Sequence, residues 1–305
     1  MKKVALLVTV LLLIVLYAQI DTQALLWYLR TMQLGVFLLA LACVVPQVFV
    51  TALRWSWMVR DIYPMRLLAS TRLILAGKAL NALLPSKLGE TSKAYFLKTH
   101  ADVALPHGVA LVLLEKVLDV AGLCAMLLVG MLLTPHLGVI ETSAILIASL
   151  ALVVVAGICT CRVVRVQRWL QGRPGLSNRL GTLLESWDTI VEQWRQEPVR
   201  LLGILLLSWG LWGFHLLQIG LFFVALRSHV EARAIIAYVP ISIFVGLLPI
   251  TIAGVGTRDA ALIRLFAPYA SAEMMAGIGL LCSVRYVLDS LIGLPFFRTY
   301  LAAKG

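Results

Sequence analysis

The sequence predicts an all-α polytopic membrane protein with about six transmembrane helices and two re-entrant hairpins, arranged in two pseudo-inverted halves. Three observations predict this fold. The 305 residues are 61% hydrophobic and 13% charged, with a mean hydropathy of +0.95, whereas soluble domains are less apolar and more charged. Several apolar runs reach the roughly 20 residues that cross a bilayer. Two further runs are broken by Leu-Leu-Pro followed by glycine. We therefore expect residues 1–305 to form a single integral membrane domain.

The expected transmembrane helices follow the apolar runs along the chain. The first run, after Lys2 and Lys3, lacks a good small-residue cleavage site, so we expect a retained helix rather than a signal peptide. The expected first half covers residues 1–142 and the second half residues 201–305. The six expected spans are residues 4–20, 34–53, 107–133, 143–161, 201–226 and 271–297.

The broken runs, residues 67–94 and 235–260, are expected to be the re-entrant hairpins. Proline removes a backbone donor and glycine frees the backbone dihedrals, so both runs should break within the bilayer. Backbone groups freed at that depth are tolerated only where protein or a water-filled cavity covers them. Broken segments at corresponding positions of two halves indicate the binding site of a transporter. An arrangement with eight full spans remains the alternative.

The charge distribution predicts the orientation. The net charge is +11, but the basic residues cluster beside apolar runs, which is the positive-inside pattern and favours anionic lipid headgroups. No basic soluble domain is present to bind nucleic acid. We expect a multi-pass protein of the cytoplasmic (inner) membrane with both termini cytoplasmic. The basic loop 162–200 contains an amphipathic helix, expected either along the cytoplasmic membrane surface or packed on neighbouring protein.

Charged residues at membrane depth are candidates for a functional site, because burying them in lipid is costly. Glu115 and Asp119 share one helix face, and Arg285 and Asp289 have the same spacing. The helical rise places Asp119 and Arg285 at similar depth, so we predict that these two residues pair. A purely structural ion pair between two helices is the alternative. The five cysteines lie in or beside apolar runs, and neither a metal site nor a cofactor is predicted.

Three motifs in order carry a resemblance to a known family. They are Asn81-x3-Pro85-x3-Gly89-Glu90 with Lys93, then Glu115-Lys116-x2-Asp119, and then Pro249-x4-Gly254-x-Gly256-x2-Asp259. Over nearly its whole length, the chain resembles the lysylphosphatidylglycerol synthase transmembrane-region family of flippase-like membrane proteins. The resemblance implies movement of lipids between leaflets, with a polar site formed by Glu90, Glu115, Asp119, Arg258 and Asp259. Asp259 stands where glutamate is more often expected, and nothing corresponds to the soluble aminoacyl-transferring domain of larger members.

The expected function is that of a flippase-like transporter that moves or binds an anionic amphipathic lipid, a phospholipid or a polyprenyl phosphate. The alternative is a non-catalytic membrane subunit that presents lipid to a separate lipid- or glycan-modifying enzyme. An embedded transferase or phosphatase is disfavoured, because the acidic and Lys-x6-Arg-Pro patterns of such enzymes are missing. Asn81, Lys87, Lys93 and Arg258 are candidates for phosphate binding. The residues expected to bind or transport lipid are Asn81, Pro85, Lys87, Gly89, Glu90, Lys93, Glu115, Asp119, Gly254, Gly256, Arg258, Asp259, Arg285 and Asp289.

Overall fold

The computed structural model describes residues 2–83, 89–134, 138–160, 176–248, 250–251 and 254–301, and no strand occurs among them. The helices of the first half are α1 (Lys2–Tyr17), α2 (Thr22–Arg30), α3 (Leu34–Ala42), α4 (Val44–Met58), α5 (Leu67–Leu83), α6 (Ser92–Ala101) and α7 (Leu105–Leu132). Those of the second half are α8 (Val139–Thr160), α10 (Leu176–Gln196), α11 (Pro198–Ala225), α12 (Ala232–Leu247), α13 (Thr257–Leu265) and α14 (Ala272–Leu301). The predicted all-α polytopic class is confirmed.

Each predicted span coincides with a helix or a helix pair. Among the described residues, four stretches are long and apolar enough to cross a membrane: Leu34–Met58, Val139–Ile158, Pro198–Ala225 and Ala272–Phe297. Helices α1 and α2 make a fifth if this pair, bent by 93°, is one span. Helix α7 has 28 residues and so is long enough to cross, although it carries three charged residues. Helix α8, by contrast, is covered very little by the rest of the protein, since only 6% of its apolar stretch is buried.

Helix boundaries follow from local sequence. Asp21 begins α2 because its carboxylate accepts the backbone N–H groups of Gln23, at 2.8 Å, and Ala24, at 3.3 Å. Pro106 and Pro198 lie in the first turns of α7 and α11, where the missing N–H of proline costs no helical hydrogen bond. Asp102 ends α6 in the left-handed conformation, with φ of 53°.

In both broken runs, the helix before the break packs on the helix after it, α5 on α6 and α12 on α13. Helices α6 and α13 have 10 and 9 residues and are too short to cross a bilayer. In each hairpin, the chain after the break lies against the end of the preceding helix. A Cβ atom at Gly89 would lie 2.5 Å from the carbonyl oxygen of Gly77, and one at Gly254 would lie 2.5 Å from that of Gly246. In both hairpins, a glycine after the break therefore packs closely against a glycine of the preceding helix. Entry and exit through the same membrane face remain a prediction.

The first helix of each hairpin packs on the last helix of the other half. Helix α5 packs along α14, and α12 packs along α7. Glycine permits both close approaches, since a Cβ at Gly293 would lie 2.1 Å from the Leu75 carbonyl oxygen and one at Gly130 would lie 2.5 Å from that of Ile236. The second helices stay with their own halves, α6 on α7 and α13 on α14. The two halves are therefore interlocked through exchanged helices.

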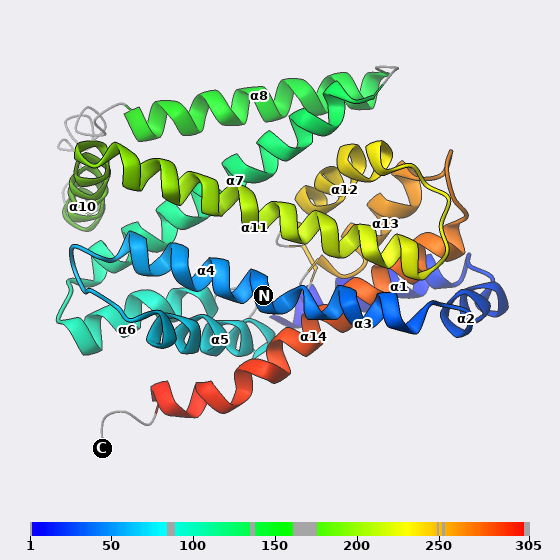
Figure 1. Cartoon of the computed structure of the whole chain (residues 1–305), viewed down its shortest axis with the longest axis horizontal. Coiled ribbons are helices and arrows are strands. Elements are labelled where there is room, and N and C mark those ends of the chain that lie inside the picture. The colour runs from blue at the N-terminus through cyan, green and yellow to red at the C-terminus, as the bar shows by residue number, and fades with distance from the viewer. Residues whose placement is uncertain are drawn as a thin grey trace.

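Figure 1 shows the two hairpins at opposite ends of the molecule, α5–α6 on the left below α4 and α12–α13 on the right beside α11. Each hairpin contributes to its own apolar core, one including Phe223 and Phe266 and the other Trp55 and Leu111. Helix α10 packs on α7 and buries Trp187 and Trp194 in the second of these cores. The amphipathic loop helix thus packs its tryptophans on neighbouring protein, and its position along the cytoplasmic membrane surface stays a prediction.

Candidate functional site

The largest polar feature of the described interior is a group of six charged side chains, which we call the first cluster. Its members are Arg54 on α4, Glu90 in the turn before α6, Lys93 on α6, and Glu115, Lys116 and Asp119 on α7.

Arg54 joins the two carboxylates of α7. Its guanidinium donates to Glu115 at 2.9 Å and to Asp119 at 2.6 Å, and also to the hydroxyl of Ser208 on α11 at 3.0 Å. The side chains of Arg54 and Glu115 are each only 1% exposed. Two carboxylates one helical turn apart repel each other unless a cation lies between them. Arg54 is that cation, and it ties α4 to α7.

Lys93 attaches the first hairpin to the same carboxylates. Its ammonium lies 2.7 Å from Glu115 and 2.6 Å from Glu90, and 5.0 Å from the centre of the Trp55 ring. Lys116 adds ion pairs to Asp119 at 3.1 Å and to Glu90 at 3.7 Å. The cluster thus contains three cations and three carboxylates and has no net charge. Arg54, Lys93 and Glu115 are nearly completely buried, whereas the side chain of Lys116 is 44% exposed. Removal of one partner from a buried ion pair is strongly destabilising.

The hairpin break lies beside the cluster. Asn81, near the end of α5, donates through Nδ2 to Glu90 at 3.4 Å, and its backbone carbonyl accepts the Tyr286 hydroxyl of α14 at 2.8 Å. Gly89 fits closely over Asn81, because a Cβ there would lie 2.5 Å from the Asn81 backbone nitrogen. Pro85 and Lys87, both predicted site residues, lie outside the described residues.

The second hairpin has a smaller, local arrangement. Gly254 and Gly256 have φ angles of 74° and 90°, values that residues with side chains rarely adopt. Asp259 accepts the Gly256 backbone N–H at 3.0 Å and the Arg258 guanidinium at 2.7 Å. Arg258 also donates to the Gly279 carbonyl of α14 at 2.9 Å. The pair is buried and neutral and binds the hairpin to the helix that follows it.

The predicted pairing of Asp119 with Arg285 is wrong. Asp119 binds Arg54 and Lys116, whereas Arg285 donates to Gln218 on α11 at 3.0 Å and lies 3.4 Å from Nδ1 of His215. Matching depth does not make two residues neighbours, and the main packing partners of α7 and α14 are other helices. Asp289, one turn beyond Arg285, pairs instead with Lys78 of α5 at 2.6 Å.

The predicted site residues therefore fall into three separate groups. The first cluster unites Glu90, Lys93, Glu115 and Asp119, with Asn81 and Gly89 beside it. A second group is the Arg258–Asp259 pair with its glycines, and a third contains Arg285 and Asp289 on α14. Lys93 and Arg258 each form ion pairs with carboxylates. The expected phosphate site, which needs both of them as free cations, is therefore not formed.

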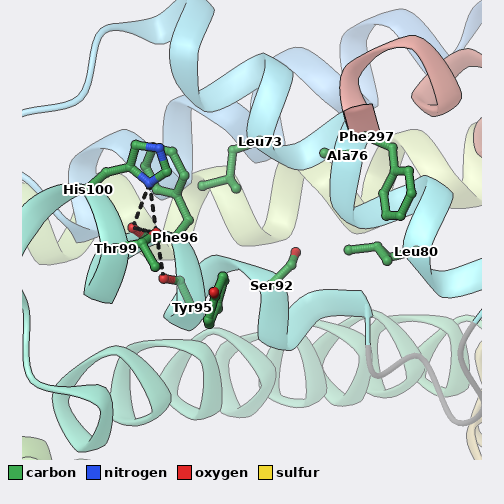
Figure 2. A pocket seen from close by; sticks show the side chains of 9 residues that line it. All are labelled: Leu73, Ala76, Leu80, Ser92, Tyr95, Phe96, Thr99, His100 and Phe297. Carbon is green, nitrogen blue, oxygen red and sulfur yellow. Dashed lines mark hydrogen bonds between the residues drawn. The ribbon is translucent and has the colours of Figure 1, made fainter. Parts of the chain in front are cut away.

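Figure 2 shows a pocket between α5 and α6, with Phe297 of α14 at its edge. Its lining is mostly apolar, and the His100 ring stacks on Phe96 with 4.3 Å between the ring centres. The empty space in the pocket is about 380 Å³, and no lysine or arginine is among its lining residues. The pocket therefore does not contain the predicted phosphate-binding side chains.

Sequence reasoning missed Arg54, Gln47 and Gln218. Arg54 looked like an interfacial residue, because hydropathy ended the second span at residue 53. The apolar pattern in fact continues through Trp55 and Met58, and both are buried. This continuation was the available signal that Arg54 lies inside the protein. The two glutamines bond to each other at 2.9 Å in the interior, and no pattern in the sequence links them.

The fold and these buried charges define a polytopic membrane protein with a polar interior beside two helix hairpins. Comparison with known proteins identifies the family. Residues 3–293 match the lysylphosphatidylglycerol synthase TM region, so the chain belongs to this family, as the three motifs predicted. The family indicates a membrane protein related to lipid handling. No curated protein matches the chain.

Proposed function

We propose that this protein is a flippase-like transporter that moves an anionic amphipathic lipid, a phospholipid or a polyprenyl phosphate, between the leaflets of a membrane. One observation carries the proposal. Two hairpins lie at opposite ends of the molecule, and a buried ion pair lies beside each, Lys93 with Glu115 and Arg258 with Asp259. Intramembrane charges of this kind mark substrate or ion pathways in transporters. The family match adds support, because it relates the chain to lipid handling.

The exchanged hairpin helices supply a physical route for coupling the halves. A tilt of α14 carries α5 with it, and a tilt of α7 carries α12, because glycines hold each pair in close contact. The polar groups between the hairpins would receive the headgroup, while the acyl or prenyl tail remains in lipid. Rocking of one half against the other would then expose the polar groups to each leaflet in turn.

The basic residues favour an orientation in the cytoplasmic (inner) membrane with both termini cytoplasmic. Arg60, Arg195 and Arg200 gather near α10, in line with the excess of basic residues on the cytoplasmic side of such proteins. The proposal includes no catalytic role and no cofactor. The expected partners are membrane lipids with anionic headgroups.

Purified protein reconstituted into liposomes tests the proposal. Fluorescent phosphatidylglycerol and a labelled polyprenyl phosphate should change leaflets faster with the protein than in empty vesicles. The Glu90→Gln variant, which unbalances the first cluster, should move lipid more slowly. Glu192→Gln, on the outer face of α10 where the side chain is 44% exposed, should behave like the unmodified protein. Movement no faster than in empty vesicles for every anionic lipid would contradict transport. If a stable enzyme partner also co-purified, the lipid-presenting alternative would be favoured.

A further inference from the structure

Arg285 differs from the other charged side chains of the interior. The first cluster, the Arg258–Asp259 pair and the Lys78–Asp289 pair are each electrically neutral. Arg285 has no carboxylate within ion-pair distance among the described residues, and its hydrogen-bond partners are Gln218 and His215, neither of which carries a negative charge. It therefore adds one uncompensated positive charge to the helical core.

The position of Arg285 makes this charge costly. It is the fourteenth residue of the 30-residue helix α14, about 20 Å from the beginning of the helix and about 24 Å from its end. Neither end of α14 is close enough for the side chain to reach an aqueous interface. A cation at such depth is normally paired or faces a functional cavity. An anion that is absent from the polypeptide is the simplest counter-charge.

The geometry of the guanidinium suits a phosphate. Only Nη1 is engaged, by Gln218 at 3.0 Å and by His215 at 3.4 Å. Nε and Nη2 have no hydrogen-bond partner in the described parts of the chain, and the side chain is partly exposed. These two nitrogens form the fork that binds two oxygens of a phosphate or carboxylate. Because an arginine can only donate, a hydrogen bond between these two side chains requires Nδ1 of His215 to accept.

A second observation points to a missing ligand at the same place. Gln47 of α4 is 1% exposed, and its Nε2 donates to the same Gln218 oxygen that accepts from Arg285. Its own oxygen, Oε1, is buried without a hydrogen-bond partner. A buried acceptor left unpaired is unfavourable, and a ligand hydroxyl or a water bound with the ligand would relieve it. The Arg285 cation of α14 and the unpaired acceptor of Gln47 on α4 thus lie on either side of Gln218 of α11.

We infer that Arg285 binds the phosphate of the transported molecule at the middle of the membrane, with Gln218 and His215 orienting the guanidinium and Gln47 accepting from a hydroxyl near the phosphate. This inference rests on the proposed function and names the substrate contact within it. It assigns the phosphate to a residue outside the two hairpins. The hairpin cations Lys93 and Arg258 then serve to hold the hairpins in place.

Binding to detergent-purified protein tests the inference with three probes: dioctanoyl phosphatidylglycerol, dioctanoylglycerol without a phosphate, and inorganic phosphate. The unmodified protein should bind the phospholipid at least about tenfold more tightly than dioctanoylglycerol, the range that a charged hydrogen bond supplies. Arg285→Gln should abolish this preference, and Arg285→Lys, which keeps the charge but loses the fork, should retain part of it. Arg264→Gln on the exposed face of α13 is the matched control and should bind like the unmodified protein.

The outcomes separate this inference from the proposed function. Equal binding of phospholipid and dioctanoylglycerol by the unmodified protein would overturn the phosphate site without any variant, which matters should Arg285→Gln not fold. A folded Arg285→Gln with unchanged preference would also overturn it. Competition by millimolar inorganic phosphate would show that free phosphate occupies the site, whereas its failure to compete would restrict the site to lipids. If Arg285-dependent binding occurs but liposomes show no transport, the site stands and the transport proposal fails.

Discussion

The two hairpins share a backbone plan but differ in how they are fastened. Gly77 and Gly89 close the first hairpin as Gly246 and Gly254 close the second. The charges of the first hairpin reach outward, through Lys93 and Glu115, to Arg54 on α4. The charges of the second are confined to its own turn and to α14. The backbone plan therefore fixes the shape of a hairpin, while the side chains decide how much of the molecule moves with it.

Because of this difference, substitutions in the two hairpins should change the free energy of unfolding by different amounts. Loss of Arg54 from the first cluster removes the cation that joins two carboxylates of α7, whereas loss of Arg258 leaves only the carboxylate of Asp259 without its cation. The following substitutions test the contrast, in order of decreasing expected effect on the free energy of unfolding.

Arg54→Met should have the largest effect. It leaves Glu115 and Asp119 on one face of α7 without the cation that joins them, and removal of one partner from a buried ion pair costs about 3–5 kcal/mol. Chemical denaturation of the detergent-solubilised protein measures the change. Arg66→Met is the control, because Arg66 is exposed and makes no ion pair with any described residue. A loss below about 1 kcal/mol for Arg54→Met would mean that the first cluster does not fasten α4 to α7.

Arg258→Met should cost less, about 1.5–3 kcal/mol, the value of hydrogen bonds to a charged group. Asp259 would keep its bond from the Gly256 N–H. Hydrogen exchange of α13 should rise while that of α6 stays unchanged. The double variant Arg258→Met/Asp259→Leu should be more stable than the sum of the two single changes predicts, because it leaves no unpaired charge. Strict additivity would show that the two side chains do not act as a pair.

Gly293→Ala and Gly130→Ala should each cost about 1–3 kcal/mol, the penalty for overpacking a tight contact. The added methyl group would meet the backbone of α5 in one variant and that of α12 in the other. Gly157→Ala is the matched control, because a Cβ at that position would have no neighbour within 4 Å apart from the adjacent turns of its own helix. Thermal unfolding distinguishes the three variants. A Gly293→Ala protein as stable as Gly157→Ala would indicate that α5 is not held closely on α14.

Arg60→Gln should have the smallest effect, about 0.2–1 kcal/mol. Arg60 lies six residues beyond Arg54 and pairs with Glu197, but both side chains are largely exposed, at 54% and 43%. Water and salt screen such a pair. Its contribution should disappear at high salt, whereas the effect of Arg54→Met should persist. An equally large and salt-resistant effect at Arg60 would remove the distinction between cluster and surface.

The sequence predicted the architecture well because its signals are local. Proline at 85 and 249 and the following glycines located both hairpins, and the spacing of Trp187 and Trp194 located α10. The partners of the charged side chains could not be predicted in the same way. Depth along a helix follows from residue number, but the neighbour that faces it depends on how helices pack. Asp119 and Arg285 match in depth and still bind different helices.

Two residues show where the limit lies. Arg54 ended a hydropathy window, so it read as an interfacial residue, although it is nearly completely buried. Arg285 was predicted as a site residue because it was expected to pair with Asp119, and that pairing does not occur. It is a candidate binding residue because it has no acidic partner in the described structure. The role of a charged residue at membrane depth depends on the charge balance of its surroundings, and only the packed structure reveals that balance.

The exchange of helices between halves also constrains assembly. Helix α5 packs on α14, and α12 packs on α7. In a fragment ending before residue 139, α5 would therefore lack its packing partner, and the surface of α7 that contacts α12 would be uncovered. Co-expressed halves of the chain should therefore reassemble, whereas neither half should accumulate alone.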